Sequence, residues 1–275
     1  MTTETEDRYD VCIVGGGVAG LSAATFTARH NFETLVLDAG ASILRRNAHL
    51  ENFPGFPAGV NARLLLDTLG DQAENAGAER RTTEVTRVAR AREADDPAGE
   101  ADEGRDSQAD ETDENHRFTV ETADGDRYGS KHVVVATKNE VGYLDVDGVG
   151  IIDRGKAFVD TDEGGRTGVD GLYAAGRLAE KPHQAVVAAG HGAEVAVALL
   201  EDDQEPFYHD WVTPKGYFTD RGRDLPPGCE EIDETERRQR ERESLDAMPD
   251  YFAQPHPDSQ ETHPSLREES EDSGT

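Results

Sequence analysis

The order of apolar and polar residues predicts a βαβ unit at the start of the chain. Asp10 to Val14 is a short apolar run, and the glycine-rich turn from Gly15 to Gly20 follows it at once. An alanine-rich stretch to about His30 is typical of a helix, and Thr34 to Asp38 is a second apolar run that ends in an acid. This succession indicates a parallel sheet covered by helices.

The rest of the pattern extends this α/β plan. Leucines at helical spacing predict an amphipathic helix from Asn61 to Ala76, with the asparagine side chain as its N-cap. Further short runs predict strands, and a last alanine-rich stretch predicts a helix from about His183 to Leu200. The predicted strands are Glu84 to Ala91, His116 to Thr122, Arg127 to Tyr128, the buried parallel strand Lys131 to Thr137, and Gly171 to Ala175.

Composition narrows the possible partners and the location of the protein. Across 275 residues the chain has 58 acidic and 28 basic side chains, a formal charge of −30. This charge disfavours nucleic acids and anionic membranes, because both are bound through basic surfaces. No apolar run reaches the roughly 18 residues of a membrane span, and the first residues lack the order of a signal peptide. We therefore expect a cytoplasmic protein with reduced thiols.

The negative charge is concentrated in two segments. Residues 93–114 contain eleven acids and one base, and residues 230–275 contain fifteen acids and five bases. We expect the first to be a disordered hairpin loop, and the second to be disordered or a solvated helix. With only five lysines against 23 arginines, the acidity favours a salt-accumulating halophile over a mesophile with acidic appendages.

These shifts in composition predict a domain organisation. A flexible start (1–8) precedes one nucleotide-binding domain (9–203), and an irregular C-terminal extension follows it. Residues 204–229 are too aromatic for a solvated linker and are expected to pack on the domain or on a partner. Residues 230–275 form the acidic tail.

The glycine-rich turn predicts binding of an adenine dinucleotide. Gly15 permits the tight turn, Gly17 lets the backbone approach a diphosphate, and Gly20 lets the helix pack on the strand. The helix N-terminus would direct N–H groups and its positive dipole end at the phosphates. Asp38, at the end of the second strand, can accept hydrogen bonds from the ribose hydroxyls. The alternative is a scaffold that keeps the glycines for packing alone.

Two further segments carry a resemblance to a known family. The sequence GLYAAG from Gly171 to Gly176 precedes Gln184 and Ala185, and Glu51 to Pro57 reads ENFPGFP. Together with the glycine turn, they resemble the FAD domain of the low-molecular-weight thioredoxin reductases, which are class II pyridine nucleotide-disulfide oxidoreductases. The resemblance extends from Tyr9 to about Glu201 and implies a Rossmann-like domain with a small antiparallel meander.

The resemblance also implies that the cofactor is FAD and which residues would bind it. The pyrophosphate would lie on the glycine turn, the adenosine ribose on Asp38 and the adenine on the main chain of Val85. Asn52, Gln184 and Ala185 would lie near the isoalloxazine ring. The full set of expected FAD-binding residues is Gly15, Gly17, Ala19, Gly20, Asp38, Arg45, Asn52, Val85, Thr137, Gly176, Arg177, Gln184 and Ala185.

The sequence departs from the family in two ways. Only the 33 residues from Lys138 to Asp170 stand where the family inserts its NADPH domain, and they are too few for one. The C-x-x-C motif is also absent, which excludes thioredoxin reduction by the usual relay. Lys138 replaces a family glycine, and Arg177 replaces an aspartate that binds the ribityl chain. Arg177 and the Arg45 loop could instead contact the diphosphate. The alternative is that these substitutions accumulated at a site that no longer binds a nucleotide.

Two functions therefore stay open. The first is an FAD-dependent oxidoreductase whose flavin is reduced by external NAD(P)H or by a redox partner protein. The second is a non-catalytic scaffold that binds FAD or derives from an FAD domain. No catalytic residue and no metal site can be assigned, and a homodimer is compatible with either function.

Overall fold

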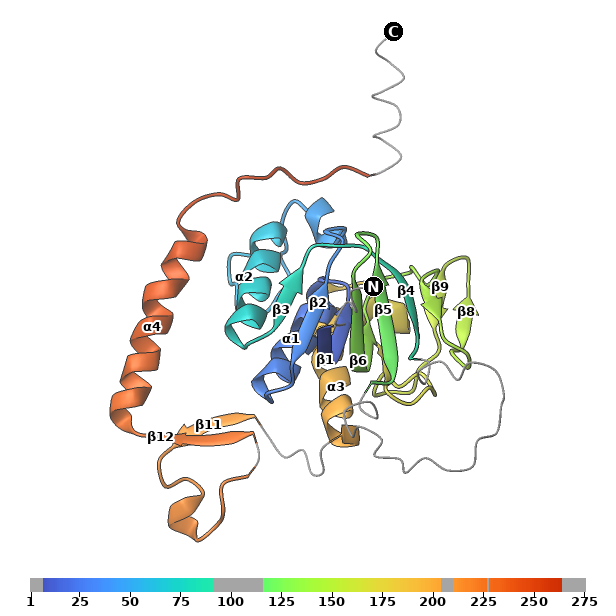
Figure 1. Ribbon diagram of the computed structural model, residues 1–275. Helices are drawn as coiled ribbons and strands as arrows, with labels where there is room; N and C mark the ends of the chain where they lie inside the picture. Colours follow the sequence, from blue (N-terminus) through green and yellow to red (C-terminus); the bar gives the residue numbers. More distant parts are fainter. Residues whose placement is uncertain (1–6, 92–115, 204–209, 227, 264–275) are drawn as a thin grey trace, which may run out of the picture.

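The computed structural model describes residues 7–91, 116–203, 210–226 and 228–263. An α/β domain with a sheet of eight strands occupies the first two ranges (Figure 1). Along the sheet the order is β3-β2-β1-β6-β5-β4-β7, and β10 pairs with the second half of β6. The strands are β1 (Asp7–Val14), β2 (Thr34–Leu37), β3 (Glu79–Arg81), β4 (Val85–Arg90), β5 (Phe118–Thr122), β6 (Arg127–Val135), β7 (Leu144–Asp145) and β10 (Leu172–Ala174).

The four neighbouring strands β3, β2, β1 and β6 are parallel to one another, as the βαβ pattern predicts. β6 differs from the prediction, because one continuous strand replaces the two separate runs expected at Arg127 to Tyr128 and Lys131 to Thr137. Its first half pairs antiparallel with β5, and its second half pairs parallel with β10. One strand therefore joins the parallel sheet to the antiparallel meander.

Three helices cover one face of the sheet: α1 (Val18–Arg29), α2 (Ala62–Asn75) and α3 (Ala185–Asp203). Val11 and Ile13 of β1 point into the core under these helices, while Cys12 and Val14 point into the core on the opposite face. This alternation follows from the two-residue period of a strand. Cys12 is fully buried, as expected for a strand residue. Burial raises the pKa of its thiol to about 12.

Helix ends match the sequence prediction where a cap specifies them. The Asn61 side chain accepts hydrogen bonds from the N–H groups of Arg63 (3.0 Å) and Leu64 (3.3 Å), which caps α2 as predicted. α3 begins at Ala185 rather than at His183, and a one-turn 3₁₀ helix (Gly176–Ala179) lies between β10 and α3.

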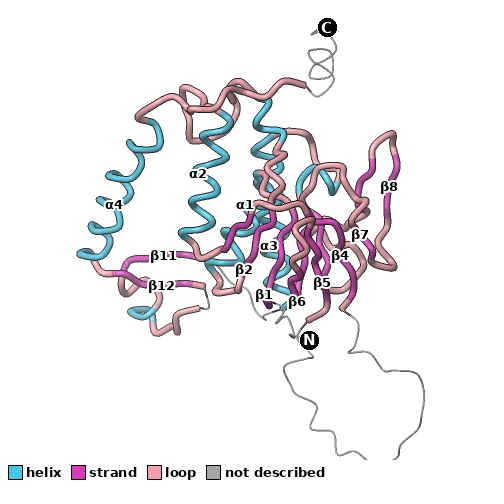
Figure 2. The backbone as a smooth tube through the Cα atoms, turned by 45° about the horizontal axis from the view of Figure 1, so that its top comes forward, coloured by secondary structure: helices cyan, strands magenta, loops and turns pink. Residues whose placement is uncertain are grey.

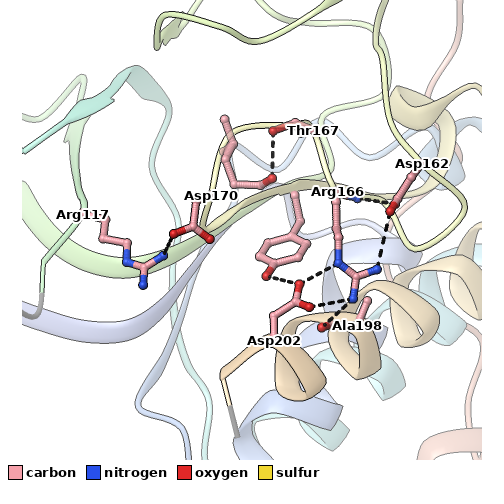
Figure 3. A network of polar contacts seen from close by, with 9 residues as sticks. Arg117, Asp162, Arg166, Thr167, Asp170, Ala198 and Asp202 are labelled. Atoms are coloured by element: carbon pink, nitrogen blue, oxygen red, sulfur yellow. Dashed lines mark hydrogen bonds and ion pairs between the residues drawn. The ribbon is translucent and has the colours of Figure 1, made fainter. Parts of the chain in front are cut away.

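A polar network ties the C-terminal end of α3 to the loop that leads into β10 (Figure 3). Asp202 accepts two hydrogen bonds from Arg166, at 2.7 and 2.8 Å, and a third from Tyr173 Oη at 2.9 Å. Arg117 pairs with Asp170 beside it. Tyr173 belongs to the GLYAAG motif, so that motif also fixes the position of α3.

The segment between β6 and β10 forms no second nucleotide-binding unit. It contains β7 and the hairpin of β8 (Ile151–Asp153) and β9 (Ala157–Val159), with no helix in residues 138–170. This confirms the prediction that the segment is too short for a second βαβ unit. The acidic segment 93–114 lies outside the described residues. The strands on either side of it, β4 and β5, pair antiparallel as predicted.

The C-terminal extension consists of β11 (Trp211–Pro214), β12 (Cys229–Ile232) and α4 (Glu234–Phe252), on the α2 side of the domain (Figures 1 and 2). Arg29 holds Asp210 through two hydrogen bonds (2.5 and 2.6 Å). At the other end, the Phe252 ring lies 5.8 Å from that of Phe56. α4 is exposed along its length, which agrees with a solvated helix. None of the described helices is both long and apolar enough to cross a membrane.

Candidate dinucleotide-binding site

A cavity of about 580 Å³ lies at the carboxyl ends of the parallel strands, beside the first turn of α1. In open α/β sheets, nucleotides bind outside this edge. Segments from five parts of the chain meet there. The lining includes Val14 to Ala19, Leu37 to Asn47 without Gly40 and Arg45, Thr83 to Val85, Ala136 to Lys138, Glu140, Tyr143, Arg177, His183 to Ala185, and Ala188.

The glycine turn has the geometry that a diphosphate requires. Gly15 has a φ of +113°, and a Cβ at Gly20 would lie 1.9 Å from the Gly15 carbonyl oxygen. Both positions therefore need glycine. A Cβ at Gly17 would meet only Ser42 Oγ, at 3.8 Å, and no side chain caps the helix that Gly17 begins. The first turn of α1 thus offers its N–H groups and positive dipole end to the cavity.

Asp38 lies against the glycine turn at the end of β2. A Cβ at Gly16 would come within 2.4 Å of its Oδ2, and its Oδ1 accepts a hydrogen bond from Gly40 N at 3.0 Å. The Asp38 carbonyl accepts a hydrogen bond from Thr83 N (3.1 Å), which brings Val85 to the same end of the cavity. A carboxylate beside a glycine turn suits a ribose diol.

The other end of the cavity is formed by the loop after β6 and the start of α3. Thr137 Oγ1 hydrogen-bonds the Tyr143 hydroxyl at 2.7 Å, which fixes this loop. Asn52 does not line the cavity, but its amide donates a hydrogen bond to Gln184 Oε1 at 2.9 Å. Asn52 therefore orients a lining residue.

The cavity thus unites most of the residues predicted from the sequence. Three of them do not line it. Gly20 packs against Gly15 and Gly176 against Ala19, both of which line the cavity, and Asn52 is hydrogen-bonded to Gln184. Arg45, which was expected to bind the cofactor, does not line the cavity, whereas its neighbour Arg46 does. The two side chains lie on a short 3₁₀ helix (Ile43–Arg46), whose rotation per residue turns neighbours to different sides. The predicted residues that line the cavity are Gly15, Gly17, Ala19, Asp38, Val85, Thr137, Arg177, Gln184 and Ala185.

His191 is a supporting residue that the sequence analysis did not assign. Its Nδ1 accepts a hydrogen bond from Gly176 N at 2.9 Å. This bond holds the turn that follows β10 and carries Arg177. Burial lowers the pKa of His191 to about 4, and the charge of Lys181 acts in the same direction. The imidazole is therefore neutral at pH 7, as an acceptor nitrogen requires. Its place about two helical turns after Gln184 was the available signal.

The two substituted positions both place cations at the cavity. Lys138 lines it with a φ of +68°, a backbone conformation that suits the glycine found in the family. Arg177 also lines it, with its guanidinium 4.7 Å from the Phe158 ring centroid, and it donates a hydrogen bond to the Lys181 carbonyl at 3.1 Å. The cavity therefore combines the glycine turn with added positive charge.

Comparisons with known proteins agree with this geometry. Residues 13–75 match the family described as NAD(P)-binding Rossmann-like domain. A bifunctional thioredoxin reductase/thioredoxin from Mycobacterium leprae is 28% identical over 162 residues, which are 58% of this chain and 30% of that protein. The thioredoxin reductase of Streptomyces coelicolor is 40% identical over 76 residues, which are 26% of this chain and 24% of that one. The chain therefore spans less than a third of these curated relatives.

Solved structures show the same fold. The thioredoxin reductase of T. acidophilum superposes with a TM-score of 0.56 and 18% identity, covering 72% of this chain and 99% of that one. A thioredoxin reductase from Gloeobacter violaceus gives a TM-score of 0.55 and 18% identity, covering 75% and 99%. Taken with the cavity, the glycine turn and the curated relatives, this makes the part of the chain from β1 to α3 a Rossmann-type nucleotide-binding domain that is similar to the thioredoxin reductases.

Proposed function

We propose that this chain is an FAD-dependent oxidoreductase whose flavin exchanges electrons with an external donor or a partner protein. The observation that carries the proposal is one cavity that runs from the glycine turn and Asp38 to Gln184 at the start of α3. Its two ends supply what the two halves of FAD need: a diphosphate-binding turn with a ribose acceptor, and a polar helix start.

The residues present fit FAD. Gly17 leaves the backbone open to a diphosphate, and Asp38 faces the same turn. Arg46 takes the role expected of Arg45, since its side chain reaches the cavity and can make charge-assisted hydrogen bonds to phosphate. Asn52 holds the Gln184 amide for the ring. When bound, FAD supplies hydride and electron transfer, and the protein supplies binding, orientation and electrostatics.

The start of α3 is open to a reaction partner. His183 and Gln184 are exposed, and Val186 and Val187 are each 37% exposed beside them. A nicotinamide nucleotide or a redox protein could therefore reach this end of the cavity without a rearrangement of the domain. The exposed apolar pair is a suitable contact for either.

The second candidate function is a non-catalytic scaffold that binds FAD or derives from an FAD domain. It is favoured by Lys138, which keeps a left-handed backbone where the family has glycine, and by Arg177 in place of an aspartate. Both functions share the fold, so spectroscopy has to separate them.

The test is a visible spectrum of the purified chain, before and after reconstitution with FAD, followed by anaerobic addition of NADH or NADPH. We expect a flavin spectrum that either nucleotide, or a supplied redox protein, bleaches. Asp38→Asn should weaken FAD binding, while Asp162→Asn, outside the cavity, should not. A chain that takes up no flavin would refute the enzyme; bound flavin that no donor reduces would favour the scaffold.

A further inference from the structure

The cavity carries more positive charge than its surroundings lead one to expect. In a sequence with 58 acidic and 28 basic side chains, Arg46, Lys138 and Arg177 all line this one cavity. Among the described residues, none of the three is ion-paired with a carboxylate, whereas the arginines of α4 and of the sheet edges mostly are. Three unpaired cations at one cavity indicate an anionic ligand.

These cations form one continuous group with Lys156. The pKa of Lys138 is lowered, first by burial and then by the charges of Arg46, Lys156 and Arg177. Burial also lowers the pKa of His183, and Lys138, Arg177 and Lys156 act on it in the same direction. The group therefore extends from the Arg46 loop to the start of α3.

The acids of the cavity lie elsewhere or are otherwise engaged. Asp38 lies at the glycine turn with Glu84 near it, at the adenosine end of the cavity. Glu140 Oε1 accepts a hydrogen bond from Gly142 N at 2.8 Å. Within residues 7–91, 116–203, 210–226 and 228–263, no carboxylate contributes to the pKa shift of Lys138 or of His183. The residues that the structure describes thus leave the positive end of the cavity without a neutralising carboxylate.

FAD alone does not account for this charge. Its diphosphate has one negative charge on each phosphate group, and the first turn of α1 already provides N–H groups for it. Since the proposed function assigns Arg46 to the diphosphate, Lys138, Arg177 and Lys156 remain as a positive excess toward the start of α3, where the isoalloxazine ring would lie. An excess of this kind favours an anionic co-ligand.

We propose that Lys138 and Arg177, with Lys156 close to them, form a subsite for the phosphate or carboxylate group of the substrate. The inference rests on the proposed function, because it places an acidic substrate beside the flavin nucleotide. The family aspartate would repel such a group, whereas Arg177 can bind it through bidentate, charge-assisted hydrogen bonds. The replacement of aspartate by arginine thus changes the substrate class that the cavity accepts.

The test is calorimetric titration of the FAD-loaded chain with inorganic phosphate and, separately, with acetate, at constant ionic strength. We expect saturable binding of at least one probe, and the stronger of the two identifies phosphate or carboxylate as the preferred group. Lys138→Gly and Arg177→Gln should each weaken it about tenfold or more, the effect of one charge-assisted hydrogen bond. Because Lys138 has a φ of +68°, glycine there removes the charge without backbone strain.

Two controls separate charge from folding. Lys138→Arg keeps the charge and should keep binding, and Lys215→Gln removes an exposed lysine on the C-terminal extension and should have no effect. Equal binding in the wild type and in both neutral variants would overturn the proposal. So would binding to the FAD-free chain that FAD abolishes, because the cations would then serve the diphosphate alone.

Failure of the proposed function gives a different result. A chain that retains no FAD refutes the flavoenzyme, and with it a substrate subsite beside the flavin. Phosphate binding that Lys138→Gly weakens in that chain would then identify an anion site only. A chain that retains FAD but binds neither probe refutes the subsite and leaves the flavoenzyme standing.

Discussion

The role of each residue at the site depends on its neighbours in space. Gly17 and Gly20 are three positions apart on the same turn, yet one faces open cavity and the other touches the Gly15 carbonyl. His191 acts at a similar scale, since one nitrogen holds the Gly176 turn. The residues around a nucleotide thus divide into those that meet it and those that keep the backbone in place.

Gly17→Ala and Gly20→Ala form a matched pair that tests this division. We expect Gly17→Ala to change the free energy of unfolding by no more than about 0.5 kcal/mol, because its Cβ has room. It should nevertheless weaken FAD binding at least tenfold by blocking the diphosphate. Gly20→Ala should cost about 3 kcal/mol, because its Cβ meets backbone at 1.9 Å. Urea denaturation and FAD titration measure both; an unchanged FAD affinity in Gly17→Ala would contradict the assignment of the diphosphate.

His191 gives stability a pH dependence. Its pKa is about 4 in the folded chain against 6.5 for an unburied histidine, so the unfolded state takes up its proton first as the pH falls. The free energy of unfolding therefore decreases from about pH 6.5 down to pH 4 and is affected no further below it. Between pH 7.5 and 4.5, wild type should lose about 2–3 kcal/mol more than His191→Asn. Equal losses in urea denaturation would show that His191 does not titrate this way.

At the scale of elements, the contact between α1 and α3 positions the cavity. A Cβ at Gly192 would lie 2.0 Å from the Ala19 carbonyl oxygen, so only glycine lets the helices approach this closely. Ala19 lies on the first turn of α1, and Gln184 immediately precedes α3. The approach of these helices therefore sets the distance between the two ends of the site, and the Asp202 network holds the far end of α3.

Gly190→Ala and Gly192→Ala test this contact on one helix. Nothing lies within 4 Å of a Cβ at Gly190, so alanine there should stabilise α3 by about 0.5–1 kcal/mol through helix propensity. Gly192→Ala should instead destabilise the chain by about 3 kcal/mol and displace α3 from α1. Thermal unfolding of both variants provides the comparison. Equal effects would mean that α3 is not tightly packed at this position.

At the scale of the whole molecule, net charge opposes compaction. A formal charge of −30 favours expanded states through self-repulsion, which salt screens. The cationic end of the cavity is a local exception to this charge. The C-terminal extension adds further acid, but it is anchored at both ends, by Asp210 on Arg29 and by Phe252 on Phe56.

We expect the unfolding temperature to rise between 0.1 and 1 M KCl. The Debye length falls over this range from about 10 to about 3 Å, which weakens repulsion between surface carboxylates. A gain of about 1 kcal/mol would raise the midpoint by about 2–4 °C. Calorimetric scans at several salt concentrations measure it, and the same scans in isomolar sucrose separate screening from solute exclusion. A flat or falling midpoint in KCl would refute this account.

Local patterns in the sequence were sufficient for the elements and for much of the site. The period of apolar residues predicts β1, α1 and β2, and the Asn61 cap predicts the start of α2, because each depends on neighbours along the chain. The glycine spacing and Asp38 predict one end of the cavity for the same reason. The shortness of the segment from Lys138 to Asp170 excludes a second nucleotide domain by length alone.

Only the tertiary structure decided how these pieces act together. It joined two predicted strands into β6, directed Arg46 rather than Arg45 at the cavity, and gave His191 its hydrogen bond to Gly176. It also gathered distant cations around Lys138. Strand continuity, side-chain direction and electrostatic grouping depend on packing between segments far apart in sequence. A local sequence pattern determines the conformation of its own segment. It does not specify which distant segment packs against it.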